Sequence, residues 1–409
     1  MAGLNQRLTG IDAARGLALL GMIATHTLPL FDGPDANPSF VGLVFSGRSA
    51  ALFAVLAGIG LALLSGKESP HHGRMLGADR RAVAGRAVVI LAAGLTLGLV
   101  QVGVAIILVH YAVLFLCLLP FLGLRLRPLA VWAVGWVVIS PIAAYLIRPM
   151  LTGWLGQRQL SGNPSWDSLQ TVHGATGVLS DVFFTGYYPV FQWIGYLLIG
   201  LVIGRLELRR LAVQLSLIIG GALLAFAATG VAGFMMDYLG GEKALLGTAQ
   251  AARWPLKSLL QVDLAWVDQS GSWWWLATAA PHAGTTLDLV QSASAAAAVV
   301  GLCLLLTHRL PRILLPLSGA GAMTLTLYTL HVWALGRTVH GLPPDWSALA
   351  LFLAHAAVAL LVGTLFALLG WRGPLELLAH GAAALAGARR REHVARRGRE
   401  GVRYRQPLR

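Results

Sequence analysis

The sequence has few charged residues, and this shortage excludes a large class of proteins. Only 12% of the 409 residues are Asp, Glu, Lys or Arg, and 56% are hydrophobic. Soluble globular proteins carry about 25% charged and about 45–50% apolar residues. The mean hydropathy of +0.70 also excludes a disordered chain, because disorder requires low hydrophobicity. A cytosolic or secreted soluble enzyme is therefore excluded.

Cysteine is almost absent as well. The two cysteines, Cys117 and Cys303, lie inside apolar stretches, so they indicate neither a disulfide framework nor a CxxC metal site. No HxxxH or Glu-His spacing supports a metal site either. We therefore expect no metal and no permanently bound cofactor.

What the sequence does have is a series of long apolar stretches. A stretch of about 18 or more apolar residues predicts a helix that crosses a membrane. The sequence predicts an all-α, polytopic integral membrane protein of about ten transmembrane helices, in a single domain of residues 1–387. The sixth stretch is short and could begin near Leu179. The ten stretches are residues 11–30, 40–64, 82–99, 102–122, 128–147, 188–203, 211–235, 287–307, 317–339 and 346–370.

The positive charge is placed asymmetrically. The formal net charge is +14, and nine arginines against two glutamates lie in residues 389–409. We expect residues 388–409 to be a disordered basic tail on anionic lipid, and we expect no nucleic acid partner. If the N-terminus is inside, every short inner loop is basic, whereas residues 32–39 hold Asp32 and Asp35 and no base. This predicts cytoplasmic N- and C-termini in a plasma membrane of the bacterial inner-membrane type.

The first stretch is not a cleaved signal peptide, because it contains Asp12 and Arg15 and no small-x-small site follows it. The oligomeric state stays open, with a homodimer as one option.

Polar residues inside these stretches are functional candidates, because a charge within a membrane is expensive. Arg15 and His26 are eleven residues apart, which places them on the same helix face, roughly 16 Å apart along the axis. Asp12 is placed to pair with Arg15. His331 lies fourteen residues into a stretch that also starts inside, so we expect it at the height of His26.

Other stretches bring further polar residues toward the same layer in the outer half of the bundle. Thr285 or Thr286 could cap a helix, with Asp288 favourable to the helix dipole. A buried histidine is often only a hydrogen-bonded structural residue, and Asp12–Arg15 could be an ion pair that orients its helix. The further candidates for this layer, all placed to line a cavity, are Arg48, His110, Tyr111, His282, Thr285 and Asp288.

Two outer loops are long, and one of them, between residues 237 and 286, is rich in tryptophan. An interfacial aromatic belt explains such residues, and so does a stacking surface for a sugar or another acceptor. The tryptophans are Trp254, Trp266, Trp273, Trp274 and Trp275.

Four motifs together resemble the heparan-alpha-glucosaminide N-acetyltransferase and YeiB-like membrane proteins. The likeness spans residues 7–376, and the order and spacing of the motifs carry it. The Arg15-x10-His26 spacing also resembles the signature of acyltransferase-3 type proteins. The motifs are Arg7…Asp12-x-x-Arg15-Gly16…Gly21-Met22…His26, Phe45-Ser46-Gly47-Arg48…Leu52-Phe53…Gly58-Ile59-Gly60, Leu325-Thr326-Leu327-Tyr328 and Gly373-Pro374-Leu375-Glu376.

The resemblance implies a polytopic acyltransferase that takes an acyl group, for example acetyl, from cytoplasmic acyl-CoA. It implies delivery to the hydroxyl or amine of an acceptor, usually a sugar, on the far side. One departure is that the heparan-modifying enzymes have Asn at the position of His26 and a key His in the following loop. Residues 31–39 of this sequence contain no histidine.

Acyl transfer from a thioester needs a base near neutral pKa, for which histidine is the usual side chain. We expect His26 to be this base or a transient acyl carrier, with His331 as the second choice. Arg48, Tyr111 or Thr285 could stabilise the oxyanion. The phosphates of the co-substrate acyl-CoA would meet arginines on the cytoplasmic side. These arginines are Arg15, Arg80, Arg81 and Arg86.

Two other functions use the same features. A transporter or flippase for a small amphipathic or lipid-linked solute would use the polar layer as a binding site. The third interpretation is a structural or accessory subunit of an envelope complex.

Overall fold

A computed structural model describes residues 8–155, 160, 162–248, 255–265, 267–341 and 346–388. Over these residues the chain is almost entirely helical, with a single pair of two-residue antiparallel strands. Arg7, Trp254, Trp266 and the basic tail from Arg389 onward lie outside the described residues. The predicted all-α architecture is confirmed for the described part of the chain.

The first half of the chain contains a core of helices and the strand pair. Its elements are α1 (Thr9–Thr27), β1 (Phe31–Asp32), β2 (Asn37–Pro38), α2 (Phe40–Phe45), α3 (Arg48–Leu64), α4 (Gly73–Leu97), α5 (Leu108–Cys117), η2 (Leu119–Gly123), α6 (Leu126–Leu155), η4 (Asp167–Leu169), α7 (Val172–Ser180), η5 (Asp181–Thr185) and α8 (Val190–Gly204).

The second half supplies the remaining helices, several of which also contribute residues to the core. Its elements are α9 (Leu211–Asp237), α10 (Gly241–Leu246), α11 (Leu256–Val262), η6 (Trp273–Ala277), α12 (Thr286–Arg309), α13 (Leu315–Ala322), α14 (Thr324–Gly341), α15 (Ala348–Leu369) and α16 (Pro374–Ala388).

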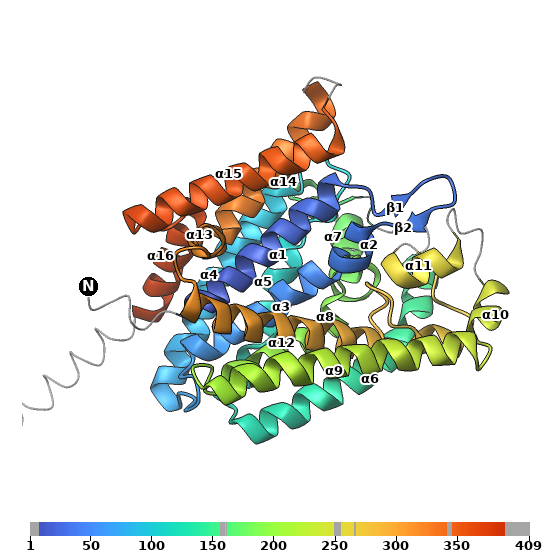
Figure 1. The fold of residues 1–409 in the computed structure, drawn as a ribbon, viewed down its shortest axis with the longest axis horizontal. Coiled ribbons are helices and arrows are strands. Elements are labelled where there is room, and N and C mark those ends of the chain that lie inside the picture. The colour runs from blue at the N-terminus through green and yellow to red at the C-terminus, as the bar shows by residue number, and fades with distance from the viewer. Residues whose placement is uncertain are drawn as a thin grey trace, which may run out of the picture.

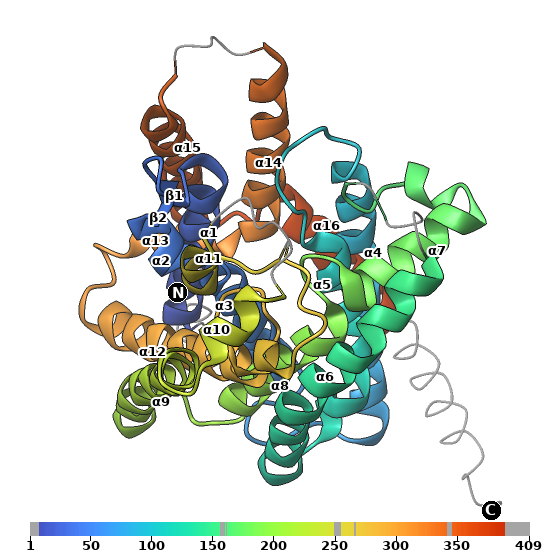
Figure 2. The same ribbon diagram turned by 90° about the vertical axis from the view of Figure 1, so that its right-hand side faces the viewer.

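The helices form a bundle whose two ends differ. Figure 1 shows α1 and α3 in the middle, α14 and α15 along one side, and α9 and α6 along the other. One end carries the strand pair, α2, α10 and α11, and we call it the loop end. The opposite end, where α13 and α16 lie, receives most of the loops that contain arginine, and we call it the arginine end. Figure 2 looks along the bundle from the loop end and shows α14, α15 and α1 on one side of it.

The number of membrane spans remains a prediction. Helices occupy each of the ten predicted stretches. Within the described residues, five helices are long and apolar enough to cross a membrane, or up to six if the bent pair of 172–185 and 190–204 is one span. Helix α5 has only ten residues, about half of what a bilayer requires. Residues 317–339 are two helices, because the chain breaks at Met323 between α13 and α14.

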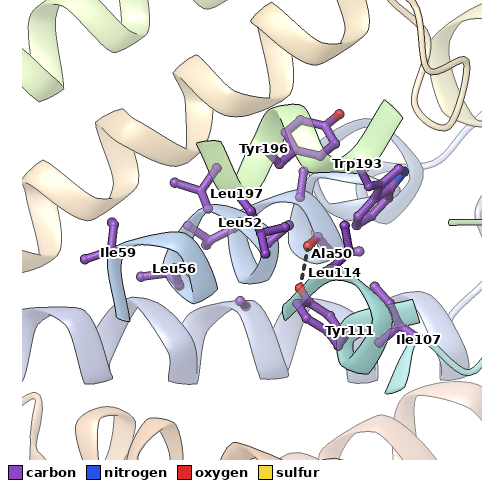
Figure 3. Packing of buried hydrophobic residues seen from close by; sticks show 14 of the residues in the cluster. Ala50, Leu52, Leu56, Ile59, Ile107, Tyr111, Leu114, Trp193, Tyr196 and Leu197 are labelled. Carbon is purple, nitrogen blue, oxygen red and sulfur yellow. Dashed lines mark hydrogen bonds between the residues drawn. The ribbon is translucent and has the colours of Figure 1, made fainter. Parts of the chain in front are cut away.

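The core of the bundle is one large cluster centred on α1, α3, α5 and α8, and a smaller cluster around α10, α11 and Trp275 lies at the loop end. Figure 3 shows Leu52 of α3 beside Leu197 of α8, and Tyr111 of α5 close to Ala50 of α3. The hydroxyl of Tyr111 donates to the carbonyl of Ala50 at 3.4 Å, which ties α5 to the start of α3. By contrast, α6, α9 and α15 keep most of their surface exposed, as helices facing lipid would.

Local signals explain where the site-bearing helices begin. Ser347 caps α15 by accepting from the amide of Ala350 at 3.1 Å. Thr285 caps α12 by accepting from the amide of Asp288 at 3.0 Å, and the Asp288 carboxylate accepts from the amide of Gly284 at 2.9 Å. The predicted cap of this helix is therefore confirmed, with Thr285 as the capping residue.

Candidate functional site

Three histidines from three helices contact one another, and we call them the histidine chain. His26, the penultimate residue of α1, has its Nδ1 3.1 Å from Nε2 of His331 on α14. The two rings are stacked with centroids 5.3 Å apart. His331 Nδ1 lies 2.7 Å from Nδ1 of His355 on α15. The prediction that His26 and His331 lie at one height is confirmed, and His355 is a partner that the sequence analysis did not assign.

A cavity of about 160 Å³ runs along the same face of α1. Arg15 and Met22 both line it, and Met22 lies seven residues, about two helical turns, closer to His26. Tyr111 and Tyr328 line it as well, and the ring of Tyr328 lies 6.4 Å from that of His26. We call this space the α1 cavity; none of the three histidines lines it, and Tyr328 is the lining residue whose ring lies near that of His26.

Arginines gather where the α1 cavity meets the arginine end. Arg15 pairs with Asp12 at 3.1 Å. Arg86 lies within electrostatic reach of Arg15, Arg372 and one opposing carboxylate, Glu376. Arg86 thus has two other guanidinium groups near it, and an excess of positive charge in one place favours a bound anion.

Glu376 connects two of the motifs that carry the family resemblance. Its Oε1 accepts from the amide of Leu325 at 2.7 Å and from that of Thr326 at 3.2 Å, and its Oε2 accepts from the Thr326 hydroxyl at 2.6 Å. These amides open α14, so the carboxylate satisfies donors that have no partner within the helix. Glu376 therefore fixes the first turn of α14 at the wall of the α1 cavity, because Leu325 also lines that cavity.

The other predicted acyl-CoA ligands are engaged in structural bonds. Arg80 donates to the carbonyl of Leu119 at 2.9 Å and to that of Pro120 at 3.3 Å. Arg81 donates to the carbonyl of Ala386 at 3.1 Å. Their guanidinium groups tie α4 to η2 and α16, and both stay at the arginine end of the bundle.

A second cavity, of about 640 Å³, lies at the loop end, and we call it the loop-end cavity. Arg148 and Gln192 meet in it, with a guanidinium-to-amide oxygen distance of 2.8 Å. Its walls combine aromatic rings with hydrogen-bonding side chains, as sites for polar ligands do. Lining residues include Tyr145, Arg148, Gln192, Asp268, Trp275 and His282.

His282 is the histidine of the loop-end cavity. Its backbone is left-handed, with φ of 61°, and its ring lies 4.1 Å from that of Tyr187 and 5.7 Å from that of Tyr188. Burial lowers the pKa of His282 below the usual 6.5. The Asp263 carboxylate and the main chain of Tyr187 oppose this shift. His282 is therefore a neutral imidazole at neutral pH.

The remaining predicted residues lie in the packed interior around these cavities. Arg48 opens α3, within electrostatic reach of Asp288. His110 lies 3.6 Å from the Asp181 carboxylate, with its ring 5.6 Å from that of Tyr188. The Thr285 hydroxyl already donates to the carbonyl of Thr278 at 2.5 Å.

The predicted layer is therefore divided. His331 and His355 also line a third space, a groove between α14 and α15. Tyr111 and Arg15 line the α1 cavity, and His282 lines the loop-end cavity. The described residues contain no group of three or more His, Cys, Asp or Glu that could hold a metal ion.

Two of the tryptophans between residues 237 and 286 lie in different surroundings. Trp273 is exposed and its ring lies 4.6 Å from that of Tyr145. Trp275 is buried and lines the loop-end cavity. The aromatic belt and the stacking surface for an acceptor both stay predictions.

A family comparison agrees with the motifs. The model of the heparan-alpha-glucosaminide N-acetyltransferase catalytic domain matches residues 7–234, more than half of the chain. The chain belongs to this family. The matched residues contain Arg15, His26, Arg86 and Tyr111, whereas His282, His331 and His355 follow the match. No curated protein matches the chain.

Sequence reasoning missed several residues of the site. Tyr328 stood in a quoted motif but was not assigned a role, although it lines the α1 cavity beside His26. Arg148 was not assigned a role, because it directly follows the predicted stretch of residues 128–147, whereas α6 continues to Leu155.

Proposed function

We propose that this membrane protein transfers an acyl group, acetyl in the simplest case, from acyl-CoA to a hydroxyl or amine of a sugar-like acceptor. The observation that carries the proposal is the α1 cavity, which is lined by Arg15 and by Tyr328, the tyrosine whose ring lies beside that of His26. An anionic donor with a long flexible arm fits such a path, because its charged part and its reactive thioester lie far apart.

The donor would bind from the arginine end, which the charge rule assigns to the cytoplasm. Its phosphates would meet Arg15, which lines the α1 cavity, together with Arg86, which lies within electrostatic reach of Arg15, and Arg372, which lies within electrostatic reach of Arg86. The pantetheine arm would follow the face of α1 past Met22. Arg80 and Arg81 would support this region rather than bind, because main-chain carbonyls hold both groups.

His26 would act as the general base through Nε2, since its Nδ1 is held by His331. Nε2 takes the proton of the attacking hydroxyl or amine, the new bond to the acyl carbon forms, and the C–S bond breaks. The thiolate that leaves is then protonated to the thiol. Tyr111 would donate to the oxyanion by turning its hydroxyl from the Ala50 carbonyl, 3.4 Å away, because of the three predicted oxyanion donors it is the one that lines the α1 cavity.

The loop-end cavity is the proposed acceptor site. Sugars offer hydroxyl groups and flat apolar faces, and this cavity offers Arg148, Gln192 and Asp268 together with the rings of Tyr145 and Trp275. Tyr188 contacts His282 on this side and also interacts electrostatically with Tyr111 and Tyr328 of the α1 cavity. A layer of tyrosines therefore separates the acceptor site from the donor path.

The test uses the full chain in lipid nanodiscs with radiolabelled acetyl-CoA and glucosamine as the probe acceptor. We expect acetyl transfer by the wild type, and a loss of about 10²–10⁴-fold in His26→Ala, the range that removal of a general base gives. His308→Ala is the matched control, because His308 is exposed on the last turn of α12.

We also expect Arg86→Gln to raise KM for acetyl-CoA more than it lowers kcat, because the arginine binds the donor and not the transition state. The proposal is wrong if acetyl-CoA does not bind at millimolar concentration, or if His26→Ala transfers acetyl groups at the wild-type rate. Solute flux into vesicles without any acyl donor would favour a transporter instead.

A further inference from the structure

We propose that His331 and His355 relay the proton of His26, and that His355 is the residue that exchanges this proton with water. The inference rests on the proposed function, because the proton in question is the one that His26 accepts. It is carried by the geometry of the histidine chain and by the groove in which the chain ends.

The two contacts of His331 restrict the tautomers of all three rings. A neutral imidazole has one N–H donor and one acceptor nitrogen. His331 uses Nε2 toward His26 and Nδ1 toward His355, so one of its contacts is donated and the other accepted. If His26 donates through Nδ1, then His331 donates to His355, and the Nε2 atom of His26 is a bare acceptor. The neutral chain therefore has two states, and in one of them His26 is ready to act as a base.

Proton uptake converts the first state into the second. A proton from the acceptor's hydroxyl or amine binds Nε2 of His26. The Nδ1 proton of His26 passes to His331 Nε2, and the Nδ1 proton of His331 passes to His355 Nδ1. His355 then releases its Nε2 proton to water. All three rings are neutral at the end, so no imidazolium charge stays in the apolar interior.

The reverse movement completes the reaction. His355 Nε2 takes a proton from water, each ring passes one proton back, and His26 gives its Nε2 proton to the sulfur of the departing thiolate. One proton has left the nucleophile and one has reached the thiol, so the proton balance of acyl transfer closes. The first tautomer of the chain is restored for the next turnover.

The groove gives the relay its exit. It has a volume of about 290 Å³ and extends from His331 and His355 to Trp346, which precedes α15 and is exposed. His355 itself is partly exposed and lies seven residues, roughly 10 Å, from the start of α15 at the loop end. Apart from the two histidines, all of the groove's lining residues are apolar or tryptophan, so no other side chain there competes for the proton. Tyr328 is the titratable group beside His26.

Two substitutions separate a relay from a structural role. In His355→Gln the amide can keep the hydrogen bond to His331 but cannot pass a proton, whereas His355→Ala leaves a space beside His331 that opens to the groove. We expect both variants to slow acetyl transfer, by less than the loss in His26→Ala. We expect added imidazole to restore the rate of His355→Ala only. The control His308→Gln should be neither slowed nor rescued.

The rate in mixtures of light and heavy water gives a second kinetic measurement. Several protons move in the wild-type relay, so the rate should depend on the deuterium fraction along a curve. A single proton moves in His355→Gln, and the dependence should be linear. A His355→Gln variant with the wild-type rate and the wild-type curve would show that His355 only supports His331, and would overturn the proposal.

A measurement without substitution distinguishes this inference from the proposed function. In the full chain labelled with 15N-histidine in lipid, we expect 15N–15N couplings through both hydrogen bonds of His331. Their absence in folded protein overturns the relay whatever the transfer assay shows. Both couplings together with no acetyl transfer by the wild type would overturn the proposed function, and with it the proton that the relay would carry.

Discussion

At the scale of single residues, His282 is the most constrained side chain of the loop-end cavity. Its φ of 61° is a conformation that residues other than glycine, asparagine and aspartate rarely adopt. A methyl group on Gly47 would press against Pro281 and approach the imidazole of His282, so the turn before α3 and this histidine are packed against each other. Backbone strain of this kind collects at functional sites, where the surrounding structure holds it in place.

His282 should make the stability of the protein depend on pH. Its pKa is lowered by burial, so the unfolded chain binds a proton at a higher pH than the folded chain does. The stabilising contribution is therefore present above the unfolded pKa and is lost as the pH falls below 6.5 toward the folded pKa. We expect the melting temperature of the wild type to fall more steeply in this range than that of His282→Asn.

Asparagine is the suitable replacement, because it tolerates a positive φ and does not titrate. The difference in unfolding free energy between the two proteins should change by up to about 1.4 kcal/mol per pH unit below 6.5. Thermal unfolding in detergent across this range measures it. If the stability of the two proteins falls equally steeply with decreasing pH, then His282 is protonated in the folded state.

Single residues also show what could be predicted from sequence. The equal height of His26 and His331 followed from counting residues from two helix starts. The same count applies to His355. His331 and His355 are each twelve residues from position 343, and antiparallel neighbours at equal distance from their connection lie at equal height. His355 stands among apolar residues without a charged neighbour, so it carries no polar signal of its own.

At the scale of helices, glycines allow α13 to pass between α1 and α15. A Cβ on Gly321 would collide with the carbonyl of Asp12, and one on Gly16 would collide with that of Leu317. On the other side, Gly319 and Gly363 bring α13 and α15 together in the same way. Small residues permit such close approach of helices in membrane proteins. This packing positions Asp12 and Arg15 at the mouth of the α1 cavity.

Replacing Gly321 with alanine should therefore destabilise the bundle. We expect Gly321→Ala to lower the unfolding free energy by about 1–3 kcal/mol, the usual effect of overpacking. The matched control is Gly220→Ala on α9, where a Cβ meets nothing within 4 Å. Alanine there should stabilise the helix by up to about 1 kcal/mol. Equal unfolding midpoints for the two variants, measured in detergent, would contradict this account of the α1–α13 contact.

Helix types were easier to predict than helix breaks. Long apolar stretches such as residues 211–235 and 346–370 became α9 and α15 because burial in lipid needs only composition and length. The break at Met323 gave no such signal, since it depends on Glu376 binding the amides of Leu325 and Thr326 from another part of the chain. A contact between distant residues leaves no periodicity in the local sequence.

At the scale of the whole molecule, the two ends of the bundle differ in charge and in structure. Arg205 illustrates the arginine end, where it is buried and donates to the carbonyls of Lys67 at 2.7 Å and Leu122 at 2.6 Å. Basic loops thus take part in the fold as well as in orientation. The sequence could predict the division between the ends, because charge excess is a property of composition, but it could not show which arginines are bound to carbonyls and which face a cavity.

Orientation in the membrane is the last prediction, and the donor's path depends on it. Loops rich in arginine stay on the cytoplasmic side, so Asp35 at the loop end should face outward and Arg312 inward. Both residues are exposed. We replace Cys117 and Cys303 with serine and introduce Asp35→Cys or Arg312→Cys, one at a time.

A membrane-impermeant maleimide applied to intact spheroplasts should then label only Asp35→Cys, and permeabilisation should expose Arg312→Cys as well. Labelling of Arg312→Cys in intact spheroplasts would place the mouth of the α1 cavity on the outside. Cytoplasmic acyl-CoA could not reach Arg15 and Arg86 in that orientation, because its charged phosphates cannot cross the hydrocarbon core unaided. The label therefore tests the direction of acyl transfer separately from its chemistry.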